Sequence, residues 1–446
     1  MRIIRQVLLM MKEEKLFSAI HIAGTAMAIA FTMVMAVVYY IKLAPIYPEV
    51  NRMRTVYFNG IEIKADMKSC LTYFGYMAYE EWFRNSPNIE YCSPTELACG
   101  RGKNDEDCQK TIVLGKDNYI EAIVNKNSTD FFKIYDYKFI SGRPFTKQEE
   151  ECAEKVCVIT DAFAEMMFGK NAKPLGKVVE IVDGPKLRVV GVVRCTSQLT
   201  PDSYADIFYP YTAPDHFASY TGCTCIVATV KDTKHLKALK KELDGIAKKI
   251  EMNHEQILAH NEYINDSVKG KVSLTEHMEI HPIHVLRTEK EKSVMSESTN
   301  WQIIKHFAGI LFILLFVPAL NLCGIVAGRM ERRTTEMAIR KTFGARSRTL
   351  LNQVIAENLV LTSIGGIIGL TVSWSAIYGM RTEILGMFFD YHTLGSAPIV
   401  TGEMLFAPLL FVGAFAAVLV LNLLSALIPA WLSLRKPIVE SMMEKR

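Results

Sequence analysis

Four long stretches without a charged residue constrain this chain more than any other feature of its sequence. They are residues 17–41, 307–328, 358–380 and 404–434. A bilayer hydrocarbon core about 30 Å thick is crossed by about 20 helical residues, and a helix satisfies its own backbone polar groups. The sequence therefore predicts a membrane protein with four transmembrane α-helices, at 17–41, 307–328, 353–380 and 404–431.

Basic residues beside the spans predict the orientation. Lys and Arg are frequent in 1–16, 329–352 and 432–446, whereas the short loop 381–403 holds one. Loops rich in Lys and Arg remain on the cytoplasmic side. We therefore expect a multi-pass membrane protein with both termini in the cytoplasm, and with 381–403 and 42–306 on the other side of the membrane.

The first span has one alternative interpretation, a cleaved signal peptide, because basic residues precede it and small residues recur in "GTAMAIA". The apolar region of a signal peptide is about 7 to 15 residues long, and this span is much longer. A retained helix is favoured on that ground.

The region 42–306 is long enough for a hydrophobic core of its own. Short β-branched or aromatic stretches predict strands, at "TVYFNGIEI", "KTIVLGK", "KVCVIT", "KVVEIV", "LRVVGVV" and "TCIVATV". Helical patterns separate them, at "AYEEWFRNS", "DAFAEMMFG" and the charged stretch that begins "DTKHLKALKKELDG". The sequence predicts a large α+β extracytoplasmic domain, divided into two subdomains, inserted between the first and second spans.

Nine of the ten cysteines lie in that domain. Disulfides in an oxidising compartment and small buried thiols are both compatible with this distribution. Cys223 and Cys225 are one residue apart in a predicted strand, which is poor geometry for a mutual disulfide. No bridge is assigned.

Three stretches imitate catalytic or metal motifs without meeting their spacing. "GKNAKPLGKVV" has glycines too far apart for a phosphate-binding loop and Val178 in place of the hydroxyl residue. "HEQILAH" places its histidines six residues apart, and Pro282 interrupts "HMEIHPIH". We expect no enzyme activity, metal or cofactor in this chain, and a net charge of only +4 gives no reason to expect nucleic-acid binding.

The basic stretch 330–351, "MERRTTEMAIRKTFGARSRTLL", lies between the second and third spans. On a helix it places Ala338, Ile339, Thr342 and Phe343 on one arc and Arg333, Arg340 and Lys341 on the opposite arc. Gly344 suits the end of that helix. Such a helix either lies on anionic membrane lipid or docks on a cytoplasmic partner.

The same stretch resembles the segment after the second span of MacB/FtsX-type ABC transporter permeases. The matching residues are Glu336, Met337, Ala338, Ile339, Arg340, Lys341, Phe343, Gly344, Ala345, Glu357, Gly365, Gly366 and Gly369. "PEVNRMRTVYF" and "DFFKIYDYKFISGRPFT" are similar to the extracytoplasmic domain of that family, and "IPAWLSLRKPIVESMMEKR" is similar to its tail. The resemblance implies that the extracytoplasmic domain has porter-like and outer subdomains. Residues 220–305 fit weakly, so the substrate or partner of the outer subdomain stays open.

The resemblance implies a permease homodimer in the bacterial cytoplasmic (inner) membrane, with its large domain in the periplasm. The homodimer would pair with a dimer of a cytoplasmic ABC ATPase, a separate chain that holds ATP and Mg. The coupling helix, within 329–352, would dock on that ATPase. Its implied ATPase-coupling residues are Glu336, Ile339, Arg340, Lys341, Phe343 and Gly344. Ile339 and Phe343 would fill a groove, and Arg340 and Lys341 would meet acidic groups at its rim.

ATP-driven motion would then cross the membrane to the outer domain, which is mechanotransmission. The implied function is export of a peptide, lipoprotein or toxic compound, with a possible periplasmic adaptor and outer-membrane channel. The alternative is an FtsX-like signalling protein that regulates an enzyme such as a cell-wall hydrolase; copurification with either kind of partner would separate them. Gly365 and Gly369 form a G-x-x-x-G pattern that allows close helix packing, within one bundle or between subunits.

Overall fold

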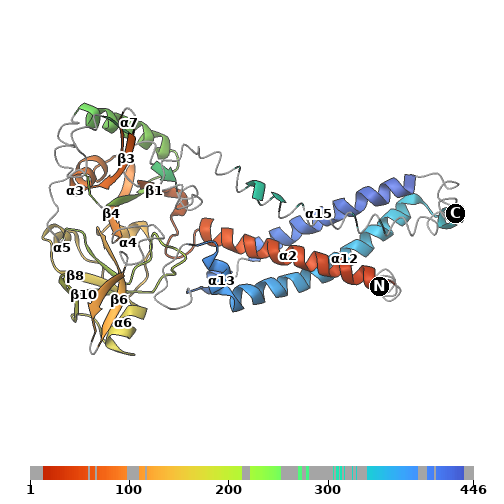
Figure 1. The fold of residues 1–446 in the computed structure, drawn as a ribbon, viewed down its shortest axis with the longest axis horizontal. Helices are drawn as coiled ribbons and strands as arrows, with labels where there is room; N and C mark the ends of the chain where they lie inside the picture. The colour runs from red at the N-terminus through yellow and green to blue at the C-terminus, as the bar shows by residue number, and fades with distance from the viewer. Residues whose placement is uncertain are drawn as a thin grey trace. The chain divides into compact units, whose positions relative to one another are not determined.

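The computed structural model divides into two compact units (Figure 1). The helical unit comprises Met1–Tyr40, Ile304–Phe388 and Gly402–Arg446, and the sheet unit comprises Ile41–Ile303 and Phe389–Thr401. The structure describes residues 14–58, 61–65, 68–97, 110–115, 118–212, 221–222, 224–252, 270–273, 278–280, 305, 308–310, 312–313, 316, 324, 328, 339–389, 399–405 and 408–435.

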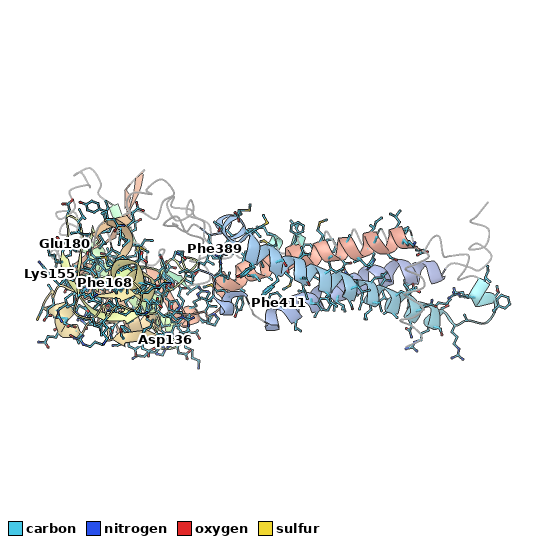
Figure 2. The ribbon with its side chains drawn as sticks, turned by 90° about the horizontal axis from the view of Figure 1, so that it is seen from below. Asp136, Lys155, Phe168, Glu180, Phe389 and Phe411 are labelled. Carbon is cyan, nitrogen blue, oxygen red and sulfur yellow. The ribbon has the colours of Figure 1, made fainter. Side chains whose placement is uncertain are left out.

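Three long helices form the core of the helical unit and run side by side (Figure 1). The helices with described bounds are α2 (Lys15–Leu43), α12 (Ser347–Gly379), α13 (Arg381–Gly386), α14 (Gly402–Leu405) and α15 (Pro408–Arg435). Ile29 and Met33 of α2 pack with Val418 of α15 in one apolar cluster. Leu370 of α12 and Phe411 of α15 pack against that cluster, and Figure 2 labels Phe411.

Two helices within the described residues, α2 and α12, are long and apolar enough to cross a membrane. They cover the first and third predicted spans, although α12 begins at Ser347, earlier than predicted. The fourth predicted span falls largely on α15, and most of the second, 307–328, lies outside the described residues. The anchor of four transmembrane helices therefore stays a prediction.

The sheet unit is built on an 11-stranded mixed sheet, counted over the described residues. Nine strands follow one path in the order β15, β1, β13, β4, β6, β11, β8, β10, β7, while β5 pairs with β6 and β9 with β10. The β6/β11 and β8/β10 pairs are parallel. The strand bounds are β1 (Thr55–Phe58), β4 (Ile89–Leu97), β5 (Lys110–Leu114), β6 (Tyr119–Asn127), β7 (Phe139–Gly142), β8 (Val156–Thr160), β9 (Val178–Glu180), β10 (Lys186–Val193), β11 (Ile207–Pro210), β13 (Cys225–Val230) and β15 (Met278–Ile280).

A smaller sheet takes β12 (Thr221–Gly222), β3 (Lys68–Phe74), β2 (Ile61–Ala65) and β14 (Gly270–Ser273), in that order. The stretch "TVYFNGIEI", predicted as one strand, is therefore two strands in two sheets. β1 pairs with β13 and β15, whereas β2 pairs with β3 and β14. The sequence itself held a signal against one continuous strand, because an Asn-Gly pair favours turns.

The main sheet is covered on both faces, and β8 shows this most simply because all five of its residues are buried. Successive side chains of a strand point to opposite faces. Val156 and Val158 accordingly enter one core with Phe131 and Phe208, while Cys157 and Ile159 enter another core. A run of consecutive apolar residues is the pattern expected for a strand buried on both sides.

Short helices pack on the sheet unit and define two lobes (Figure 1). The α7 lobe, residues 55–97 and 221–252, carries α3 (Tyr76–Ala78), the π-helical turn η2 (Tyr79–Phe83) and α7 (His235–Met252). The α6 lobe, residues 110–212, carries α4 (Phe131–Ile134), α5 (Lys147–Glu151) and α6 (Asp161–Phe168). The three helical patterns predicted in this domain lie on α3 with η2, on α6 and on α7.

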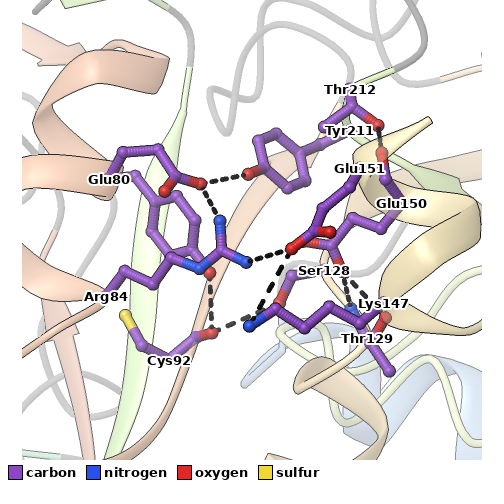
Figure 3. A network of polar contacts seen from close by, with 11 residues as sticks. Glu80, Arg84, Cys92, Ser128, Thr129, Lys147, Glu150, Glu151, Tyr211 and Thr212 are labelled. Atoms are coloured by element: carbon purple, nitrogen blue, oxygen red, sulfur yellow. Dashed lines mark hydrogen bonds and ion pairs between the residues drawn. The ribbon is translucent and has the colours of Figure 1, made fainter. Parts of the chain in front are cut away.

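A polar network joins the two lobes (Figure 3). Arg84, which follows η2, pairs with Glu80 of η2 and lies 3.6 Å from the carboxylate of Glu151 on α5. The hydroxyl of Tyr211 donates to the Glu80 carboxylate at 3.1 Å. The lobes are therefore tied by charged side chains as well as by the continuous sheet.

The cysteines whose side chains are described in this unit carry free thiols. They are Cys92, Cys152, Cys157, Cys195 and Cys225. Burial raises the pKa of the Cys195 thiol to about 12, with smaller contributions from Asp206 and Asp161. Cys195 is therefore a protonated, unreactive thiol near neutral pH. The structure does not describe the side chains of the other four cysteines in 42–306, namely Cys70, Cys99, Cys108 and Cys223.

Candidate functional site

The described part of the coupling helix is one short helical segment followed by a turn. Helical structure covers residues 339–342, and Gly344 has a φ of +90°. The amide of Ala345 donates to the carbonyl of Arg340 at 3.0 Å, and the amide of Gly344 donates to that of Lys341 at 2.9 Å. This pair of hydrogen bonds is the Schellman motif, which favours glycine because the position needs a positive φ. Gly344 thus ends the helix where the sequence predicts an end.

Two apolar side chains of this helix are exposed on its surface. Phe343 is 87% exposed and Ile339 is 42% exposed. Ile339 and Phe343 are four residues apart, a spacing that places both on one face of a helix. This is the face that the sequence predicts to be apolar. Lys341 is half-buried. Glu336 lies outside the described residues.

Arg340 contacts another part of its own chain. Its guanidinium donates to the Gln353 side chain at 3.2 Å, and the Gln353 amide nitrogen donates to the Glu357 carboxylate at 3.1 Å. Glu357 is buried in α12. These three side chains, here called the Arg340 relay, tie the coupling helix to the first turns of α12.

Gly365 and Gly369 lie against α2 of the same chain. A β-carbon at Gly365 would lie 2.9 Å from the Ile22 carbonyl oxygen, and one at Gly369 would lie 2.5 Å from the Ala26 carbonyl oxygen. Real β-carbons are essentially never found that close to backbone. The G-x-x-x-G pattern thus lies at a contact within one bundle, which is one of the two alternatives that the sequence left open.

A segment to which the sequence analysis assigned no functional residue joins α2 to β1. We call residues 44–55 the connector. Its Tyr47 ring lies 5.1 Å from the Lys138 ammonium and 5.8 Å from the Arg194 guanidinium. Its Pro48 carbonyl accepts from the amide of Asp136, labelled in Figure 2, at 2.9 Å. The connector is thus held on the α6 lobe by contacts spread along its length.

A buried ion pair lies at the point where α2 ends. The Arg52 Nε atom lies 2.9 Å from the Glu49 carboxylate, and both side chains are 2% exposed. Arg52 Nη1 donates to the carbonyl oxygens of Ile41 at 2.6 Å and Ala44 at 2.5 Å. The second Glu49 oxygen accepts from the Ser203 hydroxyl at 2.7 Å. The charged residues in "PEVNRMRT", directly after a span, were the signal that could have identified this site.

The short loop between the third and fourth predicted spans also contacts the sheet unit. The amide of Ile399 donates to the Gln198 side chain at 3.0 Å, and the Lys42 ammonium lies 5.1 Å from the Phe389 ring. Residues 389–401 belong to the same compact unit as residues 41–303. The two regions that the charge pattern predicts to lie outside the membrane are therefore in contact with each other.

Comparisons with known proteins identify two family domains along the chain. The model of the "MacB-like periplasmic core domain" matches residues 18–246, and the model of the "FtsX-like permease C-terminal" matches residues 299–438. The uncharacterized ABC transporter permease YknZ of Bacillus subtilis is 23% identical over 75% of this chain and 78% of that protein. The macrolide export ATP-binding/permease protein MacB of Mannheimia succiniciproducens is 24% identical over 59% of this chain, which covers 36% of that protein.

Solved structures add a weaker similarity. The periplasmic region of MacB from Actinobacillus actinomycetemcomitans aligns with 56% of this chain and 95% of its own, at 14% identity and a TM-score of 0.36. The extracellular domain of YknZ aligns with 45% of this chain at 15% identity and a TM-score of 0.33. The family of this chain is therefore assigned from the two family models, which together cover most of its residues.

Proposed function

This chain belongs to the MacB/FtsX family of ABC transporter permeases, and on that basis we propose that it couples ATP hydrolysis by a separate cytoplasmic ATPase to motion of its extracytoplasmic domain. Two copies of the permease would pair, and a dimer of the ATPase would hold ATP and Mg. The chain itself would be a non-catalytic membrane subunit. One observation carries the proposal: the coupling helix presents an exposed Phe343 beside Ile339.

An exposed phenylalanine on a short, well-terminated helix suits insertion into a protein groove. Burying a large apolar side chain is worth about 1.5 to 3 kcal/mol, and most of the Phe343 surface is still available for burial. The Schellman turn at Gly344 holds the helix end in one conformation, so little ordering would be needed on docking. Lys341 would meet acidic groups at the groove rim.

The contacts described above form a path along which motion could pass from the coupling helix. The Arg340 relay links the coupling helix to α12. Gly365 and Gly369 bring α12 into backbone contact with α2. We propose that closure of the ATPases shifts the coupling helix, that α12 and α2 follow because they are tightly packed, and that α2 carries the shift to the sheet unit. This is mechanotransmission.

Export is the process that we assign to this motion. Relatives of this chain include proteins named for macrolide export and pyoverdine export, which supports a role in extruding a peptide, lipoprotein or toxic compound. A periplasmic adaptor and an outer-membrane channel would complete such a route. The chain spans about a third of the length of those export proteins, which are named as combined ATP-binding and permease proteins.

The docking step is tested by pull-down of the partner ATPase with the permease in detergent. Phe343→Asp should abolish association, because the variant would bury a carboxylate in an apolar groove. Arg340→Glu should also abolish it, because the change reverses a charge and breaks the hydrogen bond to Gln353.

Met387→Asp is the matched control, since Met387 is also a highly exposed apolar residue and lies after α13. It should bind the ATPase like the wild type. Full association of Phe343→Asp, or an equal loss in Met387→Asp, would refute the assignment of Phe343 to the docking surface.

A further inference from the structure

We propose that the exposed face of α7 is a binding surface for a linear polyanion, a soluble polymer with a phosphate group on each repeating unit. Four lysines form this surface, here called the α7 lysine stripe: Lys237, Lys240, Lys241 and Lys248. All four side chains are exposed, and the whole site lies within the sheet unit. The inference goes beyond the proposed function, because binding at this face needs no ATPase.

The opposite face of α7 is fixed in the core of the α7 lobe. Leu239 and Leu243 are each 1% exposed and belong to one apolar cluster with Phe83 of η2. At about 100° per residue, three lysines of the stripe fall within about 20° of the direction opposite Leu239, and Lys240 lies at one edge. Burial of the leucines therefore holds the lysines outward.

Neighbouring side chains do not neutralise the stripe. Among the described residues, none of its four ammonium groups has an ion-pair partner. Glu242 on the same helix turns to the lobe instead, where its carboxylate accepts from Ser86 at 2.8 Å and from Asn88 at 2.7 Å. Asp244 is the one other acidic residue of α7 whose side chain is described, and it is exposed. Four positive charges and one negative charge therefore face solvent along this helix.

The stripe is elongated along the helix axis. Lys237 and Lys248 are separated by about 16 Å along the axis, at a rise of about 1.5 Å per residue. Ala238 and Gly245 are exposed beside the lysines, and a β-carbon added at Gly245 would meet no described atom within 4 Å. A polymer chain could therefore lie close to the helix backbone and meet several ammonium groups in turn.

A protein or a membrane would fit this face less well. Protein interfaces are centred on aromatic, methionine or arginine side chains, and lysine is depleted in them. The described residues on the exposed face of α7 are lysine, alanine, aspartate and glycine. An amphipathic helix that binds a membrane inserts its apolar face, and that face of α7 is already buried in the lobe. A soluble polyanion needs neither an apolar anchor nor insertion.

The choice of lysine also suits phosphate groups on a flexible chain. An ammonium group is a compact point charge with rotatable donors, whereas the planar fork of arginine favours one paired arrangement of oxygens. The sequence of α7 contains lysine and no arginine. The stripe can therefore hold successive phosphates without requiring a single register.

The test titrates fluorescently labelled inorganic polyphosphate into the full-length protein in nanodiscs of zwitterionic lipid. Fluorescence anisotropy measures the affinity. The test variant combines three substitutions in the stripe: Lys237→Gln, Lys241→Gln and Lys248→Gln. Lys241→Gln alone is measured as well, so that the surface is still tested if the triple variant does not fold.

The matched control removes the same number of charges from exposed lysines of the α6 lobe. It combines Lys155→Gln, Lys170→Gln and Lys173→Gln. The thermal midpoints of both triple variants should stay within about 2 °C of the wild type, because substitutions of exposed side chains change stability little. A difference in affinity between the two triple variants then reports where the polymer binds.

We expect the triple stripe variant to bind about ten-fold more weakly than the wild type, Lys241→Gln about two-fold more weakly, and the α6-lobe control about equally. Binding of a polyanion releases counterions. With three or four phosphate contacts, the affinity of the wild type should therefore fall about 20- to 50-fold between about 50 and 200 mM salt.

Four outcomes would overturn the proposal. They are no binding by the wild type, an equal loss in the α6-lobe control, binding of phosphatidylglycerol vesicles through the same lysines, and tighter binding of poly-L-glutamate of matched charge. The third would assign the face to a membrane and the fourth to an acidic protein. None of these measurements involves the ATPase, so failure of the Phe343 pull-down would refute the proposed function and leave this surface decided on its own.

Discussion

Replacing Gly369 with alanine would test how closely α12 approaches α2. The added β-carbon would lie 2.5 Å from the Ala26 carbonyl oxygen and 3.0 Å from the Ile29 β-carbon. An ordinary contact between carbon and a carbonyl oxygen is about 3.3 Å, so the helices would have to move apart by about 0.8 Å. Neither obstacle is the end of a flexible side chain, so rotamer changes cannot relieve the contact.

The expected cost follows from two opposing effects. Overpacking a close contact typically destabilises a protein by about 1 to 3 kcal/mol. Alanine also favours a helix over glycine by about 0.5 to 1 kcal/mol. We therefore expect Gly369→Ala to lower the free energy of unfolding by about 1 to 2 kcal/mol. Gly413→Ala in α15, where the described residues place no atom within 4 Å of an added β-carbon, should be neutral or slightly stabilising.

Titration of the detergent-purified protein with sodium dodecyl sulfate, followed by far-ultraviolet circular dichroism, would measure both variants. The unfolding midpoint of Gly369→Ala should fall, and that of Gly413→Ala should hold or rise. If Gly369→Ala is as stable as the wild type, then α2 and α12 do not touch through backbone and the proposed path between them is wrong. An equal loss in both variants would point to a general effect of substituting glycine in these helices.

Two further predictions concern a polar site on the α6 lobe and the Arg340 relay. Hydrogen bonds from Arg143, with smaller contributions from Thr146, lower the pKa of Glu149 from 4.5 to about 2 against the opposing effect of burial. A lowered folded-state pKa stabilises the protein above the unfolded-state value, and this contribution is lost as the pH falls from 4.5 towards 2. Since Arg143 is half-exposed, we expect Arg143→Gln to cost only about 1 kcal/mol near neutral pH and less near pH 3, as measured by urea unfolding; an equal cost at both pH values would contradict this pairing. Gln353→Ala should weaken binding of the ATPase by about five-fold, or about 1 kcal/mol, in a fluorescence titration, because Arg340 loses the bond that orients the coupling helix; unchanged affinity would show that the relay does not prepare the docking surface.

The elements that could be read from the sequence are those whose signal is local. The apolar stretches at the first and third spans became α2 and α12, and the amphipathic arc placed Ile339 and Phe343 on one exposed face. β8 and β10 follow runs of β-branched residues. In each case the neighbours along the chain decide the outcome, because helix length, helix face and strand alternation repeat within a few residues.

Strands without such a pattern were missed. β4 contains Pro94 and acidic residues, and β6 includes Asn125 and Asn127. They are strands because partners far along the chain complete their hydrogen bonds, as β13 and β6 do for β4. Strand pairing at long range overrides weak local preference.

The sequence by itself determined that this chain has apolar helices beside a separate α+β domain, and that a basic, amphipathic helix lies between two predicted spans. Only the tertiary structure decided that Arg340 contacts Gln353, that Gly369 faces α2, and that Glu49 binds Ser203, 154 residues away. The physical reason is the separation along the chain of the residues that interact. Hydrophobic periodicity is written in consecutive residues, whereas the partner of a buried charge depends on which distant segments the packed core brings within hydrogen-bonding distance.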